Sequence, residues 1–385
     1  MIPLGEVEIR AGLITAVRTL DRPRTDLSTH DERHGIIDAA GRVLMPAFVD
    51  AHTHACFVGS RLDEWQQKLR GVPYLDILRA GGGIMATVRA VRDASQAQLT
   101  AALRERIDLA RRSGTLTHEV KSGYGLSAEH ELKMLRAIRD DPRAIPTALL
   151  GHAIDPDDPT FIDRTINDTL PAVSAEFPGI PIDAYCETGA WSVNDTVRLL
   201  AAARALGHPI RVHADQFNSL GMIDQAIALG AASVDHLEAS PTDALDRLAA
   251  SSTFGVMLPV CGFHLDGRYA NAQYFVRAGG ALVLASNDNP GSAPSCSMPL
   301  VIALAVRHMG LSTAEAIAAT TVNPAELLGL RDRGTIAPGQ RADLILLRHT
   351  DERRLAFEVD AHPIDRVFAA DHHHVSSQHP RPIGV

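Results

Sequence analysis

The chain has 385 residues, of which 45% are hydrophobic and 22% charged, a composition typical of soluble globular proteins. Its 37 basic and 46 acidic residues give a net charge of −9, so no overall positive field draws it to nucleic acid or to an anionic membrane. No stretch of the sequence approaches the roughly 20 consecutive apolar residues of a membrane span.

The two ends of the chain predict a small β-sandwich. Residues 5–18 alternate apolar and polar side chains on either side of Ala11-Gly12, which is typical of a hairpin. Residues 334–347 show similar strand-turn-strand chemistry, with Pro338-Gly339 at the turn. We therefore expect a small β-sandwich domain from residues 1–42 and 334–370. Residues 371–385, rich in His and Pro and without periodicity, are expected to form a flexible tail.

Between these ends, residues 43–333 alternate short apolar runs with amphipathic helical segments. The eight expected strands are 43–50, 115–121, 145–152, 182–186, 209–213, 232–236, 254–259 and 281–287. Helical segments between them include 96–112, 128–139, 193–206, 222–229 and 242–250. Ser127 and Ser192 stand where they can cap two of these helices. Eight strand–helix repeats over about 250 residues predict a (β/α)₈ barrel. An open doubly wound sheet is the alternative, but no G-x-G-x-x-G follows the first strand.

Histidines follow several of the expected strands. His52-Thr-His54 comes after the first one, and residues two apart on a strand point to the same face, so both imidazoles can reach one ion at the barrel mouth. His152, His213 and His236 end later strands. A single histidine in such a place is commonly structural, whereas five on one rim predict a metal site. Neutral imidazoles suit zinc, iron or nickel, and the ion would lower the pKa of a bound water.

Other polar side chains near this rim are suited to an acidic substrate. Arg61 follows His54 by seven residues, and its guanidinium offers a two-pronged site for a carboxylate. Tyr124, just after the second expected barrel strand, can add a hydrogen bond, and Gln216 can recognise an amide. These residues predict the local cationic pocket that an acidic protein needs to bind an anion.

Taken in order, these residues resemble the imidazolonepropionase family of the amidohydrolase superfamily. The resemblance extends over roughly residues 44–343. It is carried by long motifs, of which the most particular are Asp50-Ala-His-Thr-His, Gly59-Ser-Arg-Leu-Asp-Glu, Glu119-Val-Lys-Ser-Gly-Tyr-Gly-Leu, Val212-His-Ala-Asp-Gln, Val234-Asp-His-Leu-Glu and Asn289-Pro-Gly-Ser. The resemblance implies a metal-dependent barrel hydrolase that opens 4-imidazolone-5-propanoate to N-formimino-glutamate.

The resemblance also implies roles for single residues. It makes His52, His54 and His213 metal ligands, and His236 the polarising or proton-transferring group. It assigns substrate contacts to Arg61, Tyr74, Tyr124, His152, Gln216, Asn289, Gly291 and Ser292. It further implies one divalent or trivalent metal ion, zinc or iron, a heterocyclic substrate with a carboxylate arm, and a homodimer.

The eighth strand departs from the family pattern. The family reads Thr-Asp-x-Asn-Pro-Gly there, and that Asp is a metal ligand and the base for the attacking water, whereas this chain reads Ser286-Asn-Asp-Asn-Pro-Gly. Asn287 takes the aspartate position if there is no gap, and it can ligate through its carbonyl but cannot accept a proton at pH 7. Asp288 substitutes as the catalytic carboxylate only if the strand bulges by one residue. The sequence leaves open which of the two faces the metal.

Two alternative functions follow from this asparagine. One is a paralogue that acts on a related ring, for example by removing sulfide from a thioxo-imidazolidinone propionate. The other is a ligand-binding relative that has kept the pocket but not the base. Sulfide release, formation of formiminoglutamate and the effect of Asn287→Asp discriminate among the three.

The N-terminal residues and the cysteines lead us to expect a cytoplasmic protein. The start, MIPLGEVEIRAG, lacks the basic-then-apolar order of a signal peptide. The four cysteines lie far apart without a C-x-x-C pair, which argues against a disulfide framework or a structural zinc knuckle; they are Cys56, Cys186, Cys261 and Cys296.

Overall fold

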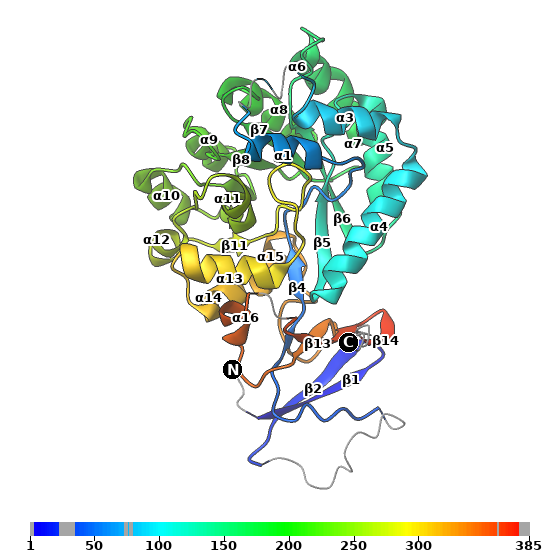
Figure 1. The fold of residues 1–385 in the computed structure, drawn as a ribbon, viewed down its shortest axis with the longest axis vertical. Coiled ribbons are helices and arrows are strands. Elements are labelled where there is room, and N and C mark those ends of the chain that lie inside the picture. The colour runs from blue at the N-terminus through cyan, green and yellow to red at the C-terminus, as the bar shows by residue number, and fades with distance from the viewer. Residues whose placement is uncertain (1–3, 23–34, 73–75, 77–79, 360–361, 377–385) are drawn as a thin grey trace.

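The computed structural model describes residues 4–22, 35–72, 76, 80–359 and 362–376 (Figure 1). Its main body is an eight-stranded sheet in which every strand pairs in parallel with the next one along the chain. The strands are β4 (Phe48–Asp50), β5 (Thr115–Lys121), β6 (Ala144–Gly151), β7 (Ile182–Cys186), β8 (Arg211–Ala214), β9 (Ser233–His236), β10 (Phe254–Met257) and β11 (Leu282–Leu284). The predicted barrel is confirmed.

Backbone hydrogen bonds join the ends of the first and last barrel strands. The amide of Asn287 donates to the carbonyl oxygen of His52 at 3.0 Å, and the amide of His54 donates to the carbonyl oxygen of Asp288 at 2.9 Å. Because these contacts lie just beyond the strands' carboxyl ends, the predicted histidine pair and the Asn287-Asp288 pair meet at the seam of the barrel mouth.

Helices cover the outside of the barrel. They are α1 (Leu62–Leu69), α3 (Ile84–Asp93), α4 (Gln96–Arg112), α5 (Ala128–Arg139), α6 (Phe161–Arg164), α7 (Leu170–Glu176), α8 (Val193–Ala205), α9 (Met222–Ala228), α10 (Thr242–Ala249), α11 (Pro259–Leu265), α12 (Ala272–Arg277), α13 (Met298–His308), α14 (Thr313–Ala318), α15 (Val322–Leu327) and α16 (Arg354–Phe357), with a π-helical turn at Thr165–Thr169. Ser127 and Ser192 accept hydrogen bonds from the backbone amides of the first turns of α5 and α8, as predicted. Among the described helices, none is long and apolar enough to cross a membrane.

Two antiparallel sheets lie together at one end of the molecule, below the barrel (Figure 1). The hairpin of β1 (Gly5–Arg10) and β2 (Leu13–Thr19) forms one. The other has the strand order β14 (His372–Ser376), β13 (Ile364–Ala369), β12 (Leu344–Leu347) and β3 (Leu44–Pro46). Ile14 of the hairpin and Leu344 of β12 belong to one buried apolar cluster, so the two sheets share a small core. This arrangement is the small sandwich expected from the two ends of the chain.

Three predicted segments differ from the structure. The strand at 43–50 is divided, because Ala47 donates to the Asp343 carbonyl in the small sheet while Phe48 donates to Gly114 beside the barrel. The strand-turn-strand at 334–347 is wrong for its first half: only Leu344–Leu347 is a strand. Residues 371–385 do not all form a tail, since His372–Ser376 pair with β13; residues 377–385 lie outside the described residues.

Candidate active site

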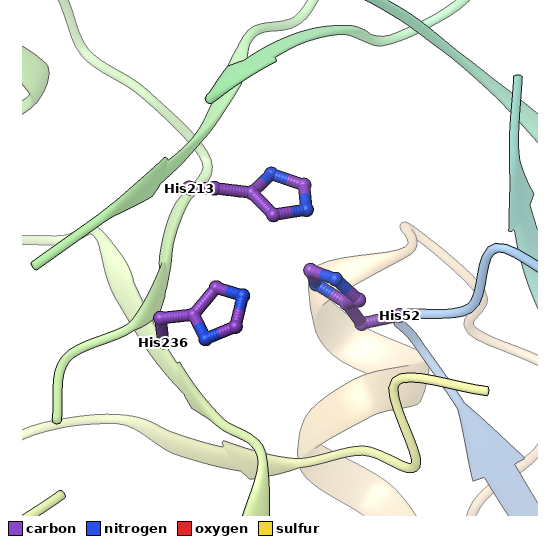
Figure 2. A group of neighbouring side chains, drawn as sticks. All are labelled: His52, His213 and His236. Atoms are coloured by element: carbon purple, nitrogen blue, oxygen red, sulfur yellow. The ribbon is translucent and has the colours of Figure 1, made fainter. Parts of the chain in front are cut away.

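Five imidazoles meet at the carboxyl ends of the barrel strands. The ring centroids of His52 and His213 lie 4.5 Å apart, those of His213 and His236 5.6 Å apart, and the rings of His54 and His152 stack at 5.0 Å. Figure 2 shows that the rings of His52, His213 and His236 point into the same space from three different segments. The five histidines that the sequence placed on one rim are therefore neighbours.

The nitrogen atoms of this cluster are arranged for a cation. Nε2 of His54 lies 3.3 Å from Nε2 of His52 and 3.4 Å from Nε2 of His213, and ligand atoms of His52, His213 and His236 all lie within 4.8 Å of one another. Burial, with the positive charge of Lys121 and of the neighbouring histidines, holds the pKa of His52 well below its usual range. Neutral imidazoles direct lone pairs at each other here, an arrangement that a bound metal ion would stabilise.

Two aspartates hold the outer nitrogens of these rings. Nδ1 of His52 lies 2.6 Å from Oδ2 of Asp235, and Nδ1 of His213 lies 3.1 Å from Oδ1 of Asp183. Carboxylates in this position fix the tautomer of a metal-binding histidine and increase its basicity. Sequence analysis did not identify Asp183 or Asp235. Their signal was an ionisable residue inside an apolar strand, and both are fully buried.

A layer of buried charges lies next to these aspartates. The amine of Lys121 is 2.8 Å from both Glu119 and Asp183, and Arg211 contacts Asp235 at 2.7 Å and Glu119 at 3.3 Å. The two cations therefore neutralise most of the charge of three carboxylates that have no access to water. The layer fixes the orientation of both aspartates and, through them, of His52 and His213.

His236 differs from the other histidines in its charge. Both carboxylate oxygens of Glu238 lie 3.2 Å from its Nδ1. Burial opposes the charged ring, but Glu238 and the Cys261 sulfur outweigh burial and raise the pKa of His236 to about 10. Glu238 therefore favours the charged form of the ring, which can donate a hydrogen bond into the site.

Asn287 and Asp288 face different surroundings. Asn287 has a positive φ of 59°, and its buried Oδ1 atom has no hydrogen-bond partner within the described part of the chain. Asp288 instead lines a small cavity with Asp50, Arg106 and Cys296, and burial raises its pKa to about 6. Its carboxylate is not among the groups within 4.8 Å of all three of His52, His213 and His236. Asp288 therefore stands apart from this group of three, and its catalytic role stays a prediction.

Arg61 stands at the rim but already has an acidic partner. Its Nε and Nη2 atoms donate to the carboxylate of Glu64 at 2.5 and 2.6 Å. The remaining Nη1 faces the loop after β11, where a Cβ on Gly291 would lie 3.0 Å from it. A glycine at that position therefore avoids a tight contact with Nη1, for which the described part of the chain shows no hydrogen-bond partner.

The other predicted substrate residues lie around the same rim, apart from Tyr74, which lies outside the described residues. The rings of Tyr124 and His152 are 5.1 Å apart, and Gln216 accepts a hydrogen bond from the hydroxyl of Tyr185 at 2.8 Å. In the loop after β11, the side-chain oxygen of Asn289 accepts from the amides of Gly291 and Ser292 at 2.9 and 2.7 Å. Asn289 thus shapes this loop instead of pointing freely into the site.

We expect Glu64→Gln to lower the free energy of unfolding at neutral pH by about 1–3 kcal/mol, because the buried carboxylate accepts charged hydrogen bonds. Burial by itself would raise the pKa of Glu64, but hydrogen bonds from Arg61 and Lys68 lower it from 4.5 to about 2. A carboxylate with a depressed pKa stabilises the fold above its unfolded pKa and loses that effect as the pH falls. Urea unfolding of both proteins should show the difference shrinking between pH 4.5 and about 2; a difference independent of pH would contradict this account.

Comparison with known proteins agrees with a histidine-rich site at the mouth of a barrel. The model of the amidohydrolase family matches residues 43–371, and the chain belongs to that family. It is 41% identical over 365 residues to the imidazolonepropionase of Deinococcus deserti, which covers 94% of this chain and 90% of that protein. It is 38% identical over 360 residues to the imidazolonepropionase of Geobacillus kaustophilus, covering 90% and 84%.

Solved structures share the fold at low sequence identity. The 5-methylcytosine deaminase of Klebsiella pneumoniae, liganded with phosphonocytosine, has a TM-score of 0.76 and 16% identity over 98% of this chain and 97% of that one. An adenosine deaminase from Xanthomonas campestris with bound zinc has a TM-score of 0.65 and 17% identity over 95% and 87%. At these identities the likeness shows the barrel and its accessory sheets, and it shows nothing of the substrate.

Proposed function

We propose that this chain is a metal-dependent cyclic amidohydrolase that converts 4-imidazolone-5-propanoate to N-formimino-glutamate by adding water and breaking one ring C–N bond. The observation that carries the proposal is its identity of 41% to imidazolonepropionases over nine-tenths of the chain. A histidine cluster beside a rim arginine supports it, because the substrate would need both hydrolytic chemistry and a partner for its carboxylate.

The residues that would hold the metal are His52, His54, His213 and Asn287. The neutral imidazoles and the unpaired Oδ1 of Asn287 fit one zinc or iron ion. When bound, such an ion supplies Lewis acidity and lowers the pKa of a bound water. The structural reason to include Asn287 in place of Asp288 is that its amide oxygen is buried without another partner.

Arg61 would bind the propionate arm with the free edge of its guanidinium, while Tyr124, His152 and Gln216 would border the ring. His236 in its charged form would donate a hydrogen bond to the ring oxygen that gains negative charge. Because Asn287 cannot accept a proton, we assign proton transfer to the pair of His236 and Glu238, which are 3.2 Å apart.

The experiment that tests this function is a product assay with the metal-loaded protein. We expect imidazolone propionate to yield formiminoglutamate stoichiometrically, and a thioxo-imidazolidinone propionate to yield no sulfide. Sulfide release without ring opening would instead support the paralogue, and tight binding without any turnover would support the ligand-binding relative.

We expect Asn287→Asp to bind its metal about tenfold more tightly or better, which corresponds to about 1.4 kcal/mol, and to keep hydrolytic activity. An ionised carboxylate is a stronger ligand than a neutral amide. Metal affinity is measured by competition with a chelator. Asn271→Asp is the matched control, because Asn271 caps α12 away from the site and aspartate caps equally well. An unchanged affinity would remove Asn287 from the proposed ligands.

The proposal includes three broader features. We propose that the two ends of the chain, predicted as residues 1–42 and 334–370, form one structural unit together with Leu44–Pro46 and His372–Ser376, and that the barrel between them forms the other. We also propose that the protein is a homodimer, and that it is cytoplasmic, with its four free cysteines in reduced form. Light scattering tests the dimer, and a monomer at working concentration would contradict it.

A further inference from the structure

A second cluster of metal-ligating side chains lies beside the histidines. It consists of His236, Glu238 and Cys261, whose ligand atoms all lie within 4.8 Å of one another. His236 and Cys261 are buried, and Glu238 is partly exposed. His236 belongs to both groups, but it has two ring nitrogens. Nδ1 faces Glu238, and Figure 2 shows another ring nitrogen turned toward His52 and His213.

The backbone brings these three side chains together by an unusual turn. His236 and Leu237 both have positive φ, 92° and 71°, which L side chains rarely adopt. The turn places Glu238 next to the ring of His236 directly after β9. Cys261 lies in a different segment, the first turn of α11. Its sulfur accepts a hydrogen bond from Nε2 of Gln216 at 3.2 Å. Strain of this kind often accompanies a functional site.

The cluster also has a route from solvent. Glu238 and Cys261 line a small cavity whose wall includes Phe217, Asp266 and Arg268. Asp266 is exposed and Arg268 is partly exposed, so the cavity reaches the surface. A metal ion can therefore enter on this side without passing His52 and His213.

We propose that His236, Glu238 and Cys261 form a second metal site, distinct from the one assigned above, for a thiophilic divalent cation such as Zn²⁺ or Cd²⁺. One thiolate, one imidazole and one carboxylate suit a borderline or soft cation and exclude Mg²⁺ and Ca²⁺, which take oxygen ligands. Binding displaces two protons into solvent, one from the thiol of Cys261 and one from Nδ1 of His236, and it takes Nδ1 of His236 from its contact with Glu238.

Occupancy of this site inhibits the enzyme, an effect that rests on the function proposed above. The pair of His236 and Glu238 would no longer exchange a proton with the substrate, because both are then metal ligands. Catalysis would fall in kcat, while Arg61 and the carboxylate arm would be unaffected. The site thus makes the activity sensitive to excess zinc or cadmium.

The test titrates the metal-loaded holoenzyme with Cd²⁺ and follows the ultraviolet charge-transfer absorption of cadmium thiolate. The residues assigned to the first metal contain no cysteine, so this absorption reports only sites that include one. We expect wild type to bind one further equivalent with this absorption. Cys261→Ala should lose it, and Glu238→Gln should weaken binding about tenfold or more. Cys296→Ala is the matched control, because Cys296 is the most exposed of the four thiols and should leave the titration unchanged.

A second measurement compares each variant's turnover with and without excess Cd²⁺, relative to its own metal-loaded rate. We expect wild type and Cys296→Ala to lose activity and Cys261→Ala to keep it. Equal thiolate absorption in wild type and Cys261→Ala, with both folded by circular dichroism, would overturn the proposal. If wild type shows the absorption but opens no imidazolone ring, the metal site stands and the proposed function fails.

Discussion

Replacing His52 by alanine is expected to empty the proposed metal site and to lower kcat/KM by at least about 10³-fold, since loss of an outer partner alone costs roughly 10–100-fold. The ring is fully buried, its Nε2 faces His54 at 3.3 Å, and its Nδ1 is held by Asp235 at 2.6 Å. Alanine removes a ligand and leaves Asp235 without this contact. Metal content per protein after dialysis, together with the rate of ring opening, measures the effect.

His308→Ala is the matched control for this change. His308 is exposed on α13, where its ring stacks on that of Tyr269 with the centroids 4.7 Å apart. It is not one of the histidines assigned to the site. It should keep both metal and activity. Full metal occupancy in His52→Ala would exclude His52 from the ligands and would contradict the assignment of the site.

The barrel could be predicted because each of its strands and helices has its own short pattern of apolar and polar residues. Residues 115–121 and 182–186 are strands within the predicted bounds, since each is a short apolar run between polar turns. The prediction for residues 334–347 is wrong in its first half. This segment has turn residues and apolar alternation, but Gly339 donates to the carbonyl of Ile14 in β2 and Ala342 donates to that of Gly12 just before β2, without forming a regular strand. Only tertiary pairing decides between these outcomes.

The site could be predicted only as far as histidines mark strand ends. The sequence placed His52, His213 and His236 on one rim, and they meet there. It could not show that Glu64 occupies two donors of Arg61, because that ion pair depends on the loop conformation. It also could not choose between Asn287 and Asp288. Asn287 has a positive φ, and period-two reasoning about a strand does not include such a conformation.

Replacing Lys121 by methionine is expected to have the largest effect on stability, a loss of about 3–5 kcal/mol in the free energy of unfolding. Lys121 is fully buried, with its amine 2.8 Å from Glu119, 2.8 Å from Asp183 and 3.9 Å from Asp235. Methionine fills a similar volume but leaves three buried carboxylates facing the single guanidinium of Arg211. Such uncompensated charge is costly because water cannot reach it.

Lys68→Met makes the same chemical change in an ion pair near the surface, where the Lys68 amine lies 3.0 Å from Glu64, and should cost only about 0–1 kcal/mol. Thermal and urea midpoints of the two variants measure the contrast, and equal losses would show that the buried layer is not the cause.

A purely structural role for Lys121 would leave metal affinity unchanged in the folded protein. We expect instead that affinity falls about 10–100-fold, because Asp183 loses the amine that orients it toward His213. The lysine therefore connects the stability of the barrel to the geometry of its mouth.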